Sequence, residues 1–331
     1  MSKLYVISGM TGMTGNELAR QLVKRGDAVI GFDNLFASST DTIADIEEED
    51  NLTFFQYDLN CAAHMAIVGK LVAERKADFD SLIFINCAAV VHTEYFYQVN
   101  STFDTNVVGM RNFLEQAIML GADEYINCST SEVYSMRSWA DGGVCESDPV
   151  LIDTAEQSQR TSYASGKLLT EFFMADAVQK GLIKGCSIRF ANVYSKNERF
   201  AKHVIPHVLR SLDESGKVTL LENSRKNRRT FLHNIDSCAA VLALADTPEA
   251  LDGSVYNVAT DEEYSILELV DMCARKLGIS NPAIEFEGYR PSDPERRLLN
   301  TEKIRSRTSW APRITLEEGV EMCVADMRKD R

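Results

Sequence analysis

The sequence predicts an α/β protein that combines a doubly wound parallel sheet with a smaller C-terminal α/β part. Over the first 190 residues, short apolar runs alternate with longer segments of helical periodicity. This alternation is typical of βαβ units, in which helices cover both faces of a parallel sheet. After residue 190 the regular alternation ends, which indicates a second, smaller region.

The elements can be placed in order along the chain. Strands are predicted at 3–8, 28–32, 52–56, 81–86, 124–129 and 185–190, and helices at about 15–25, 103–121 and 162–181. Beyond these, a helix is expected at 197–216, an extended segment at 228–236, a late strand at 251–259 and a final helix at 316–329. We therefore expect a first domain over residues 1–190, with a returning segment near 230–260, and a second domain over 191–331 that closes over the carboxyl ends of the strands.

Composition limits the class of protein. Of the 331 residues, 45% are hydrophobic and 25% charged, as in ordinary soluble proteins. The formal net charge of −14 argues against nucleic acid and anionic membranes as partners, because both would repel the protein. The eight cysteines show no Cys-x-x-Cys spacing, which favours reduced thiols, and no metal site is expected. Without a basic leader or an apolar run of about 18 residues, the protein is expected in the cytoplasm.

A glycine-rich segment follows the first strand and opens the first helix, with Gly9, Gly12 and Gly15 at its key positions. Glycines there let the backbone turn tightly and approach a pyrophosphate closely, while the helix N-terminus favours negative charge. Asp33 ends the second strand, where a carboxylate accepts hydrogen bonds from an adenosine ribose. An acidic residue repels a 2′-phosphate and the following Asn34 is not basic, so the segment favours NAD over NADP.

Asp58 and Leu59 follow the third strand, where the adenine of the cofactor is expected. A solvated aspartate at the end of a strand explains Asp58 equally well. The sequence leaves both interpretations open.

Tyr163 and Lys167 lie four residues apart on a predicted helix and therefore share one face. A tyrosine normally ionises near pH ~10, and a nearby ammonium favours the phenolate. The pair would thus provide a base near neutral pH, as hydride removal from a secondary alcohol requires. This spacing alone is often a surface pair, but here it follows a nucleotide loop and the hydroxyl cluster at 129–131.

With these motifs in this order, the chain resembles the extended short-chain dehydrogenase/reductases, specifically the NAD-dependent nucleotide-sugar epimerases and dehydratases. The resemblance covers nearly the whole chain. The matching segments are "GMTGMTG" at 9–15, "NCAA" at 86–89, "TNVVGMRNFLEQA" at 105–117, "STSEVY" at 129–134, "YASGK" at 163–167, "RFANVY" at 189–194, "RRTFLHNID" at 228–236, "YNVATDEEYSILEL" at 256–269 and "RPSDPERR" at 290–297.

The resemblance implies a Rossmann domain that holds NAD, a domain for a nucleotide-diphosphate sugar, and a homodimer formed through the helices near 102–120 and 161–180. For the cofactor it implies contacts with Ala88 and Lys167, the latter at the nicotinamide ribose. Thr130 and Tyr163 would hydrogen-bond the 4-oxygen of the sugar. The substrate-binding residues that it implies are Asn192, Arg229 and Arg290.

Two departures from the family pattern concern the substrate. "NERFAKH" at 197–203 replaces the usual "GPRQ" loop, and "RTF" at 229–231 stands where "RDF" is usual. They bear on the shape of the substrate rather than on hydride transfer. His92 is interpreted as a loop or core histidine, not as a catalyst.

Glu132 bears on the reaction that follows hydride transfer. A 4-epimerase needs only the tyrosine, the lysine and one hydroxyl, whereas a base beside a 4-keto sugar can remove the C5 proton while an acid expels the 6-hydroxyl. The Thr130, Ser131 and Glu132 arrangement resembles that of GDP-mannose-type 4,6-dehydratases, and also that of UDP-glucuronate decarboxylases. We place 4,6-dehydration slightly ahead of 4-epimerisation, with a decarboxylase or a net NAD-dependent oxidoreductase as further alternatives. A purely structural role for Glu132 also remains open.

Overall fold

The computed structural model describes residues 2–92, 95–96, 98–134, 142–152, 161–196, 198, 200–290 and 293–329. Its centre is a parallel seven-stranded sheet of order β11-β6-β5-β4-β1-β2-β3. The strands are β1 (Lys3–Ser8), β2 (Ala28–Asp33), β3 (Leu52–Gln56), β4 (Ser81–Asn86), β5 (Glu124–Thr130), β6 (Lys184–Phe190) and β11 (Asp252–Val258). The predicted fold class is confirmed, and each of these strands ends within one residue of its predicted bounds.

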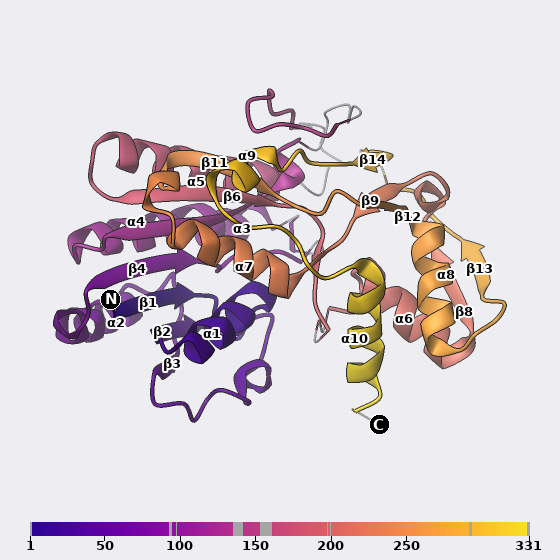
Figure 1. Cartoon of the computed structure of the whole chain (residues 1–331), viewed down its shortest axis with the longest axis horizontal. Helices are drawn as coiled ribbons and strands as arrows, with labels where there is room; N and C mark the ends of the chain where they lie inside the picture. The colour runs from indigo at the N-terminus through magenta and orange to yellow at the C-terminus, as the bar shows by residue number, and fades with distance from the viewer. Residues whose placement is uncertain are drawn as a thin grey trace.

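Helices cover both faces of the sheet, as Figure 1 shows. Successive side chains of β1 point to opposite faces, so Tyr5 and Ile7 enter one core while Leu4 and Val6 enter another. The first core is covered by α1 (Met13–Arg25) and α7 (Asn234–Ala245), and the second by α2 (Ala62–Arg75), α4 (Met110–Met119) and α5 (Thr161–Gln179). Burial on both faces explains why the strands are nearly continuous apolar runs.

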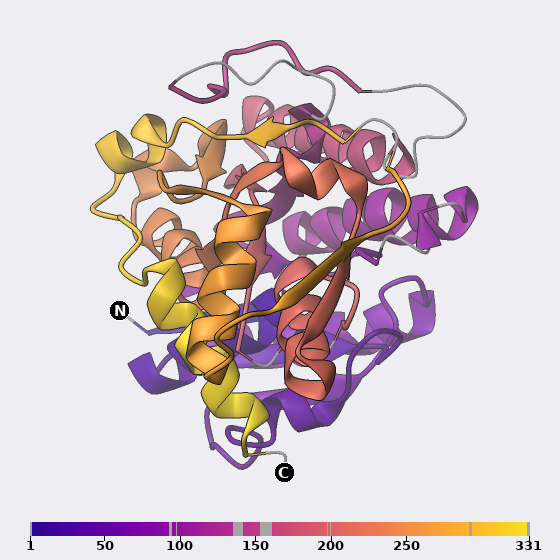
Figure 2. The same ribbon diagram turned by 90° about the vertical axis from the view of Figure 1, so that its right-hand side faces the viewer.

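A smaller layer with its own apolar core lies beyond the carboxyl ends of the strands. It contains α6 (Val204–Ser215), α8 (Ile266–Leu277) and α10 (Leu316–Met327), together with the parallel pair β8 (Lys217–Leu220) and β13 (Ala283–Phe286). Figure 2 looks onto this layer, with α8 and α10 side by side in front. Across the described part of the chain, no helix is both long and apolar enough to span a membrane.

Short elements join the two layers. Strand β9 (Arg228–Thr230) lies between β12 (Glu263–Ser265) and β14 (Arg296–Arg297), and β7 (Val193–Tyr194) pairs with β10 (Leu232–His233). The remaining elements are α3 (Val99–Phe103), the π-helical η4 (Asp104–Gly109), α9 (Glu302–Arg307) and the 3₁₀ turns η1 (Thr40–Ile43), η2 (Lys76–Asp78), η5 (Ser131–Tyr134), η6 (Glu222–Arg225) and η7 (Pro248–Ala250).

Helix α6 begins at Val204, several residues later than predicted. Pro206 lies in its first turn, where the missing N–H costs no intrahelical hydrogen bond. Had the helix begun near residue 197, Pro206 would stand in its interior and break it. The described residues before the helix, among them Phe200 and His203, line a cavity instead.

A buried ion pair holds α5 against the sheet. Arg189 on β6 donates from Nε and Nη2 to the two carboxylate oxygens of Glu171 on α5, at 2.9 and 2.6 Å. The side chains of Arg189 and Glu171 are only 6% and 4% exposed. The hydroxyl of Ser129 on β5 donates to the same carboxylate at 2.5 Å, and Arg189 also donates to the phenol oxygen of Tyr134. The network therefore connects α5, β5 and β6.

We predict that Glu171→Gln lowers the free energy of unfolding by about 3–5 kcal/mol, because it leaves the Arg189 guanidinium buried without a counter-charge. Denaturant unfolding followed by circular dichroism measures this change. The matched control is Glu115→Gln, which removes a carboxylate from the exposed Arg111–Glu115 pair on α4, where the separation is 3.7 Å. Its effect should stay within about 0.5 kcal/mol; equal effects of the two variants would contradict the assignment.

Candidate functional site

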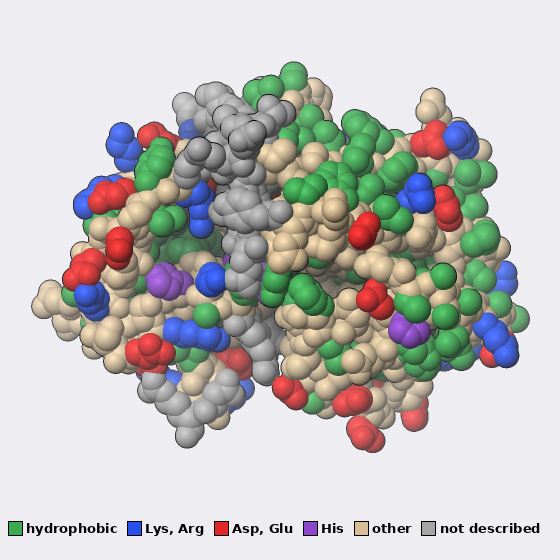
Figure 3. Space-filling view, turned by 180° about the vertical axis from the view of Figure 1, so that it is seen from behind, with side chains coloured by type: hydrophobic (Ala, Val, Ile, Leu, Met, Phe, Trp, Pro, Cys, Tyr) green, Lys and Arg blue, Asp and Glu red, His purple; other side chains and the backbone are tan. Residues whose placement is uncertain are grey.

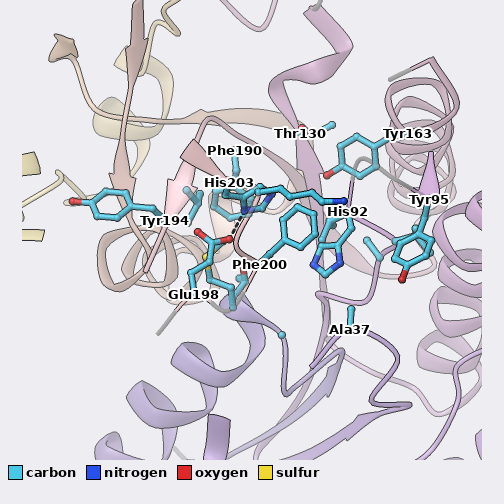
Figure 4. Close-up of a pocket in the computed structure, with 18 of the residues that line it drawn as sticks. Ala37, His92, Tyr95, Thr130, Tyr163, Phe190, Tyr194, Glu198, Phe200 and His203 are labelled. Carbon is cyan, nitrogen blue, oxygen red and sulfur yellow. Dashed lines mark hydrogen bonds and ion pairs between the residues drawn. The ribbon is translucent and has the colours of Figure 1, made fainter. Parts of the chain in front are cut away.

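A cavity of about 1100 Å³ lies where the carboxyl ends of the sheet strands meet the smaller layer. The glycine segment and the ends of β2, β4 and β5 line it from the sheet side, and parts of 192–207, 219–231 and 287–297 line it from the other. Figure 4 shows the part of it around Tyr163. Every site residue predicted from the sequence lines this cavity except Ser131, which is buried outside the lining.

The glycine segment fits tightly against β4. Gly9 has a φ of +70°, and a Cβ at this position would lie 2.7 Å from the Cα and N atoms of Ala88. A Cβ on Gly15 would lie 2.2 Å from the carbonyl oxygen of Gly9. The N–H groups of Gly9 and Met10 both donate to the carbonyl oxygen of Phe32, at 2.9 and 3.1 Å. Only glycine fits at Gly9 and Gly15, and Gly12 lies beside them on the cavity wall.

Asp33 holds this loop in place. One carboxylate oxygen accepts the N–H of Thr11 at 3.2 Å and the other accepts the N–H of Leu35 at 2.9 Å. An ionised carboxylate has about four acceptor sites, so each oxygen keeps capacity for a further donor. Next to it, Asn34 donates to Asp58 at 3.3 Å, and the buried Leu59 follows on the same wall.

The catalytic candidates come from β5 and α5. Thr130 is the last residue of β5, and the Tyr163 ring stacks on Phe96 with centroids 4.7 Å apart. Figure 4 shows the Tyr163 hydroxyl directed toward the side of the cavity that holds Thr130. Burial raises the pKa of the Tyr163 phenol, and the interaction with the Thr130 side chain offsets only part of this effect.

Lys167 is buried at the same end of the cavity. Its ammonium donates to the carbonyl oxygen of Cys128 at 2.7 Å, and burial lowers its pKa. The Cys128 thiol lies 3.9 Å from the thiol of Cys87, the residue that directly follows β4. In this arrangement Lys167 is anchored to the end of β5, on the same helix face as Tyr163.

Glu132 lines the cavity from η5, the turn that follows the end of β5 at Thr130. The N–H of Glu132 donates to the hydroxyl oxygen of Thr130 at 3.2 Å, and the same turn buries Ser131 away from the cavity. Both carboxylate oxygens of Glu132 accept from Arg297, whose Nη2 lies 3.1 Å from Oε2. This partner was not predicted from the sequence.

The predicted substrate-binding residues also line the cavity. Asn192 has a φ of +44°, and its side-chain amide nitrogen is buried without a hydrogen-bond partner among the described residues. Arg229 is buried and pairs with Asp293 at 3.1 Å. The backbone of Arg290 is held by the side chain of Asn223 at 2.8 and 3.0 Å, which leaves the Arg290 side chain on the cavity wall. Residues 291 and 292 of the "RPSDPERR" segment lie outside the described residues.

An aromatic wall that sequence reasoning missed closes one side of the cavity. His92 stacks on Phe200 with centroids 4.0 Å apart and an interplanar angle of 11°. His203 meets the edge of Phe200 at 4.8 Å and pairs with Glu198, as Figure 4 shows. The unusual "NERFAKH" segment was the available signal. Within the described residues, no cluster of His, Cys, Asp and Glu side chains has the arrangement of a metal site.

Residues 5–259 match the NAD-dependent epimerase/dehydratase family. The chain belongs to this family. It is 26% identical to the dTDP-D-glucose 4,6-dehydratase of Mus musculus, over 99% of this chain and 90% of the mouse protein. It is 24% identical to UDP-glucuronic acid decarboxylase 1 of Arabidopsis thaliana, over 98% of this chain and 69% of the plant protein.

Solved structures of similar fold include a UDP-glucose 4-epimerase from Thermotoga maritima, with a TM-score of 0.85 and 18% identity over 99% of both chains. A dTDP-glucose 4,6-dehydratase from Streptomyces venezuelae, solved with NAD bound, has a TM-score of 0.83 and 21% identity over 99% of this chain and 98% of that chain. Family membership confirms the predicted enzyme class and NAD as the cofactor. The glycine segment fits this cofactor, because the missing Cβ atoms of Gly9 and Gly15 let the loop lie tightly against β4 and against itself, with its backbone on the cavity wall.

We predict that Gly9→Ala reduces bound NAD at least tenfold, because the new Cβ forces the loop away from Ala88. The cofactor is released from purified protein by acid and measured. Gly26→Ala is the control: it has a similar φ of +86° at the end of α1, but no atom lies within 4 Å of the added Cβ. It should cost about 1–2 kcal/mol of stability and leave the NAD content unchanged. Loss of NAD from both variants would show that backbone strain alone is responsible.

Proposed function

We propose that this enzyme converts a nucleotide-diphosphate sugar through a transient 4-keto intermediate, with 4,6-dehydration as the leading reaction. The observation that carries the proposal is the composition of a single cavity. Tyr163, Thr130 and Lys167 line it together with Asn192 and Arg229. A sugar joined to a nucleotide by a diphosphate has the matching chemistry, since its hydroxyls need hydrogen-bonding groups and its phosphates need buried donors and cations.

In this proposal NAD lies along Gly9, Gly12, Gly15 and Ala88, with its adenosine beside Asp33, Asn34, Asp58 and Leu59. The free acceptor sites of Asp33 suit the ribose hydroxyls, and the absence of a basic side chain at Asn34 suits an unphosphorylated ribose. When bound, the nicotinamide supplies the acceptor and donor of the hydride. Residues 1–190, with the returning segment near 230–260, would form this cofactor half, and residues 191–331 the substrate half.

Tyr163 is proposed as the base that takes the proton of the C4 hydroxyl, with the Thr130 hydroxyl holding the same oxygen. Burial disfavours the phenolate, so a positive charge has to lie nearby when the base acts. Lys167 supplies that charge from the same helix face. Its position is fixed by the Cys128 carbonyl, which prevents the long side chain from leaving the catalytic end.

Glu132 is proposed as the base that removes the C5 proton from the 4-keto sugar. The same proton, passed to the 6-hydroxyl, would let that group leave as water, and the hydride would then return to C6 as C5 takes up a proton. Its carboxylate lines the cavity two residues from Thr130, so a sugar held at C4 by Thr130 presents its C5 and C6 side to Glu132 or to its partner Arg297. Ser131, predicted as a further catalytic residue, has the weakest support, because its side chain is buried outside the lining.

Decarboxylation is a second candidate, and it is favoured by Arg297. A buried guanidinium beside Glu132 could hold the carboxylate on C5 of a hexuronate while the 4-ketone makes its loss easy. A 4-epimerase and a net NAD-dependent oxidoreductase would use the same Tyr163 and Lys167 but need neither Glu132 nor Arg297. The Glu132–Arg297 pair is therefore the feature that ranks these alternatives.

A homodimer through the outer face of η4 and α5 is also part of the proposal. Phe172 and Leu169 on α5 and Val108 on η4 are exposed apolar side chains on neighbouring elements. In Figure 3, which views the molecule from behind the sheet, hydrophobic side chains gather over the half that these helices cover. A cytoplasmic location is proposed as well, because all eight cysteines are free thiols.

The reaction is tested by incubating the purified protein with UDP-, GDP-, CDP- and dTDP-linked hexoses and with UDP-glucuronate. Products are followed by mass spectrometry and nuclear magnetic resonance. We expect loss of water from one nucleotide hexose without added cofactor, because the hydride returns to the product. Glu132→Gln should reduce this loss at least a hundredfold, while reduction of the bound cofactor by the substrate, followed at 340 nm, persists. Loss of carbon dioxide would support decarboxylation, and a C4 epimer of unchanged mass would contradict the role of Glu132.

The dimer is tested with Phe172→Glu, which places a charge in the proposed interface. Phe172 is 59% exposed in the single chain. We expect sedimentation velocity to show a dimer for the wild type and at least a tenfold weaker association for the variant. Ile67→Glu, at an exposed apolar position on α2, is the control and should leave the dimer intact. A monomeric wild type would refute the dimer.

A further inference from the structure

A buried chain of charges connects Arg229 with Glu132. Asp293 accepts from Asn227 at 2.7 Å and pairs with Nη2 of Arg229 at 3.1 Å. Its other oxygen lies 3.9 Å from Nη2 of Arg297, the residue that binds both oxygens of Glu132. All four charged side chains line the cavity, and their exposed fractions range from 4% for Arg297 to 15% for Glu132.

The charges balance only as long as no anion is present. Two arginines face two carboxylates, so the set has no net formal charge. A diphosphate bound at Arg229 adds negative charge beside Asp293, in a buried environment where like charges repel strongly. The phosphates then replace Asp293 as the partner of Arg229, and Arg297 is a cation within reach of Asp293, with Nη2 at 3.9 Å from its other oxygen.

Arg297 is able to change partners. Its Nε is buried without a hydrogen-bond partner among the described residues, although a buried guanidinium normally has all its donors satisfied. In a second arrangement, with Arg297 bonded to Asp293, the Nε of Arg297 would therefore gain the hydrogen bond that it lacks in the present one. The same shift would loosen the two hydrogen bonds from Arg297 to Glu132. A carboxylate that loses a neighbouring positive charge and its hydrogen bonds becomes a stronger base.

We propose that Asp293 is a positioning residue that couples the binding of the substrate diphosphate at Arg229 to the release of Glu132 from Arg297. The second chemical step at C5 then waits until the nucleotide is in place. This inference rests on the proposed function, since it assigns a use to the release of Glu132. It goes further by making Asp293 the connection between Arg229 and Arg297.

The test separates hydride transfer from the second step. Asp293→Asn keeps the size and hydrogen bonding of the side chain but removes its charge. We expect single-turnover reduction of the bound cofactor, followed at 340 nm, to stay within threefold of the wild type. The kcat for product should fall at least tenfold at a KM changed less than threefold. Glu295→Gln, which removes a side-chain carboxylate 72% exposed in the same segment, should change none of these values.

Several outcomes would overturn the inference. A raised KM at constant kcat would make Asp293 a simple binding residue, and an equal loss of both steps would make it structural. Wild-type values of kcat and KM in Asp293→Asn would show that Asp293 has no role in the reaction. Thermal unfolding and NAD content show whether Asp293→Asn is folded.

A second measurement uses the wild type and depends neither on folding of the variant nor on turnover. A water-soluble carbodiimide with glycine ethyl ester labels accessible carboxylates, and peptide mapping reports the labelling of Glu132. We expect dTDP or UDP alone to accelerate this labelling at least threefold, because Arg297 releases the carboxylate. No acceleration with either nucleotide would refute the coupling. The labelling of Glu132 does not depend on which product the enzyme forms, so it reports on the coupling even if the wild type proves to be a 4-epimerase. Failure of the coupling and failure of the proposed function are therefore distinguishable.

Discussion

The catalytic end of this protein depends on the buried ion pair between Glu171 and Arg189. Glu171 lies one helical turn beyond Lys167 on α5, and Arg189 lies on β6, so the pair fixes how far α5 can slide along the sheet. Ser129, the residue before Thr130, donates a hydrogen bond to the same carboxylate. The distance from Tyr163 and Lys167 on α5 to the Thr130 hydroxyl on β5 is thus set by two charges that water does not screen. A buried pair of this kind stabilises little in total, yet it makes alternative registers of α5 costly.

The fold and the cofactor loop were predictable because their signals are local. Nearly continuous apolar runs identify strands buried on both faces, and Gly9 and Gly15 are required by contacts within their own βαβ unit. Asp33 illustrates the limit of such reasoning. Its position at the end of β2 was foreseen, but its two hydrogen bonds to the N–H groups of Thr11 and Leu35 could not be. They depend on how the loop folds back on the strand.

The remaining features of the site depend on long-range contacts or on where a strand ends. Glu132 and Arg297 are 165 residues apart, and no periodicity links them. Strand alternation alone would put Glu132 on the same side as Thr130 and Ser131 on the other, and the 3₁₀ turn that follows β5 keeps this arrangement. The start of α6 is different, because Pro206 was a local signal that a helix could not begin much earlier.

The position of β11 at the edge of the sheet has a consequence for the integrity of the chain. After β6 the backbone passes through the smaller layer, returns to lay down α7 and β11 against the sheet, and then leaves again. Tyr256 and Val258 of β11 belong to the same apolar core as β1. A fragment that stops at residue 190 would therefore expose the edge of β6 and half of one sheet face, a surface prone to aggregation. The two halves are interleaved in the chain, so neither can be inherited, excised or exchanged as a contiguous module.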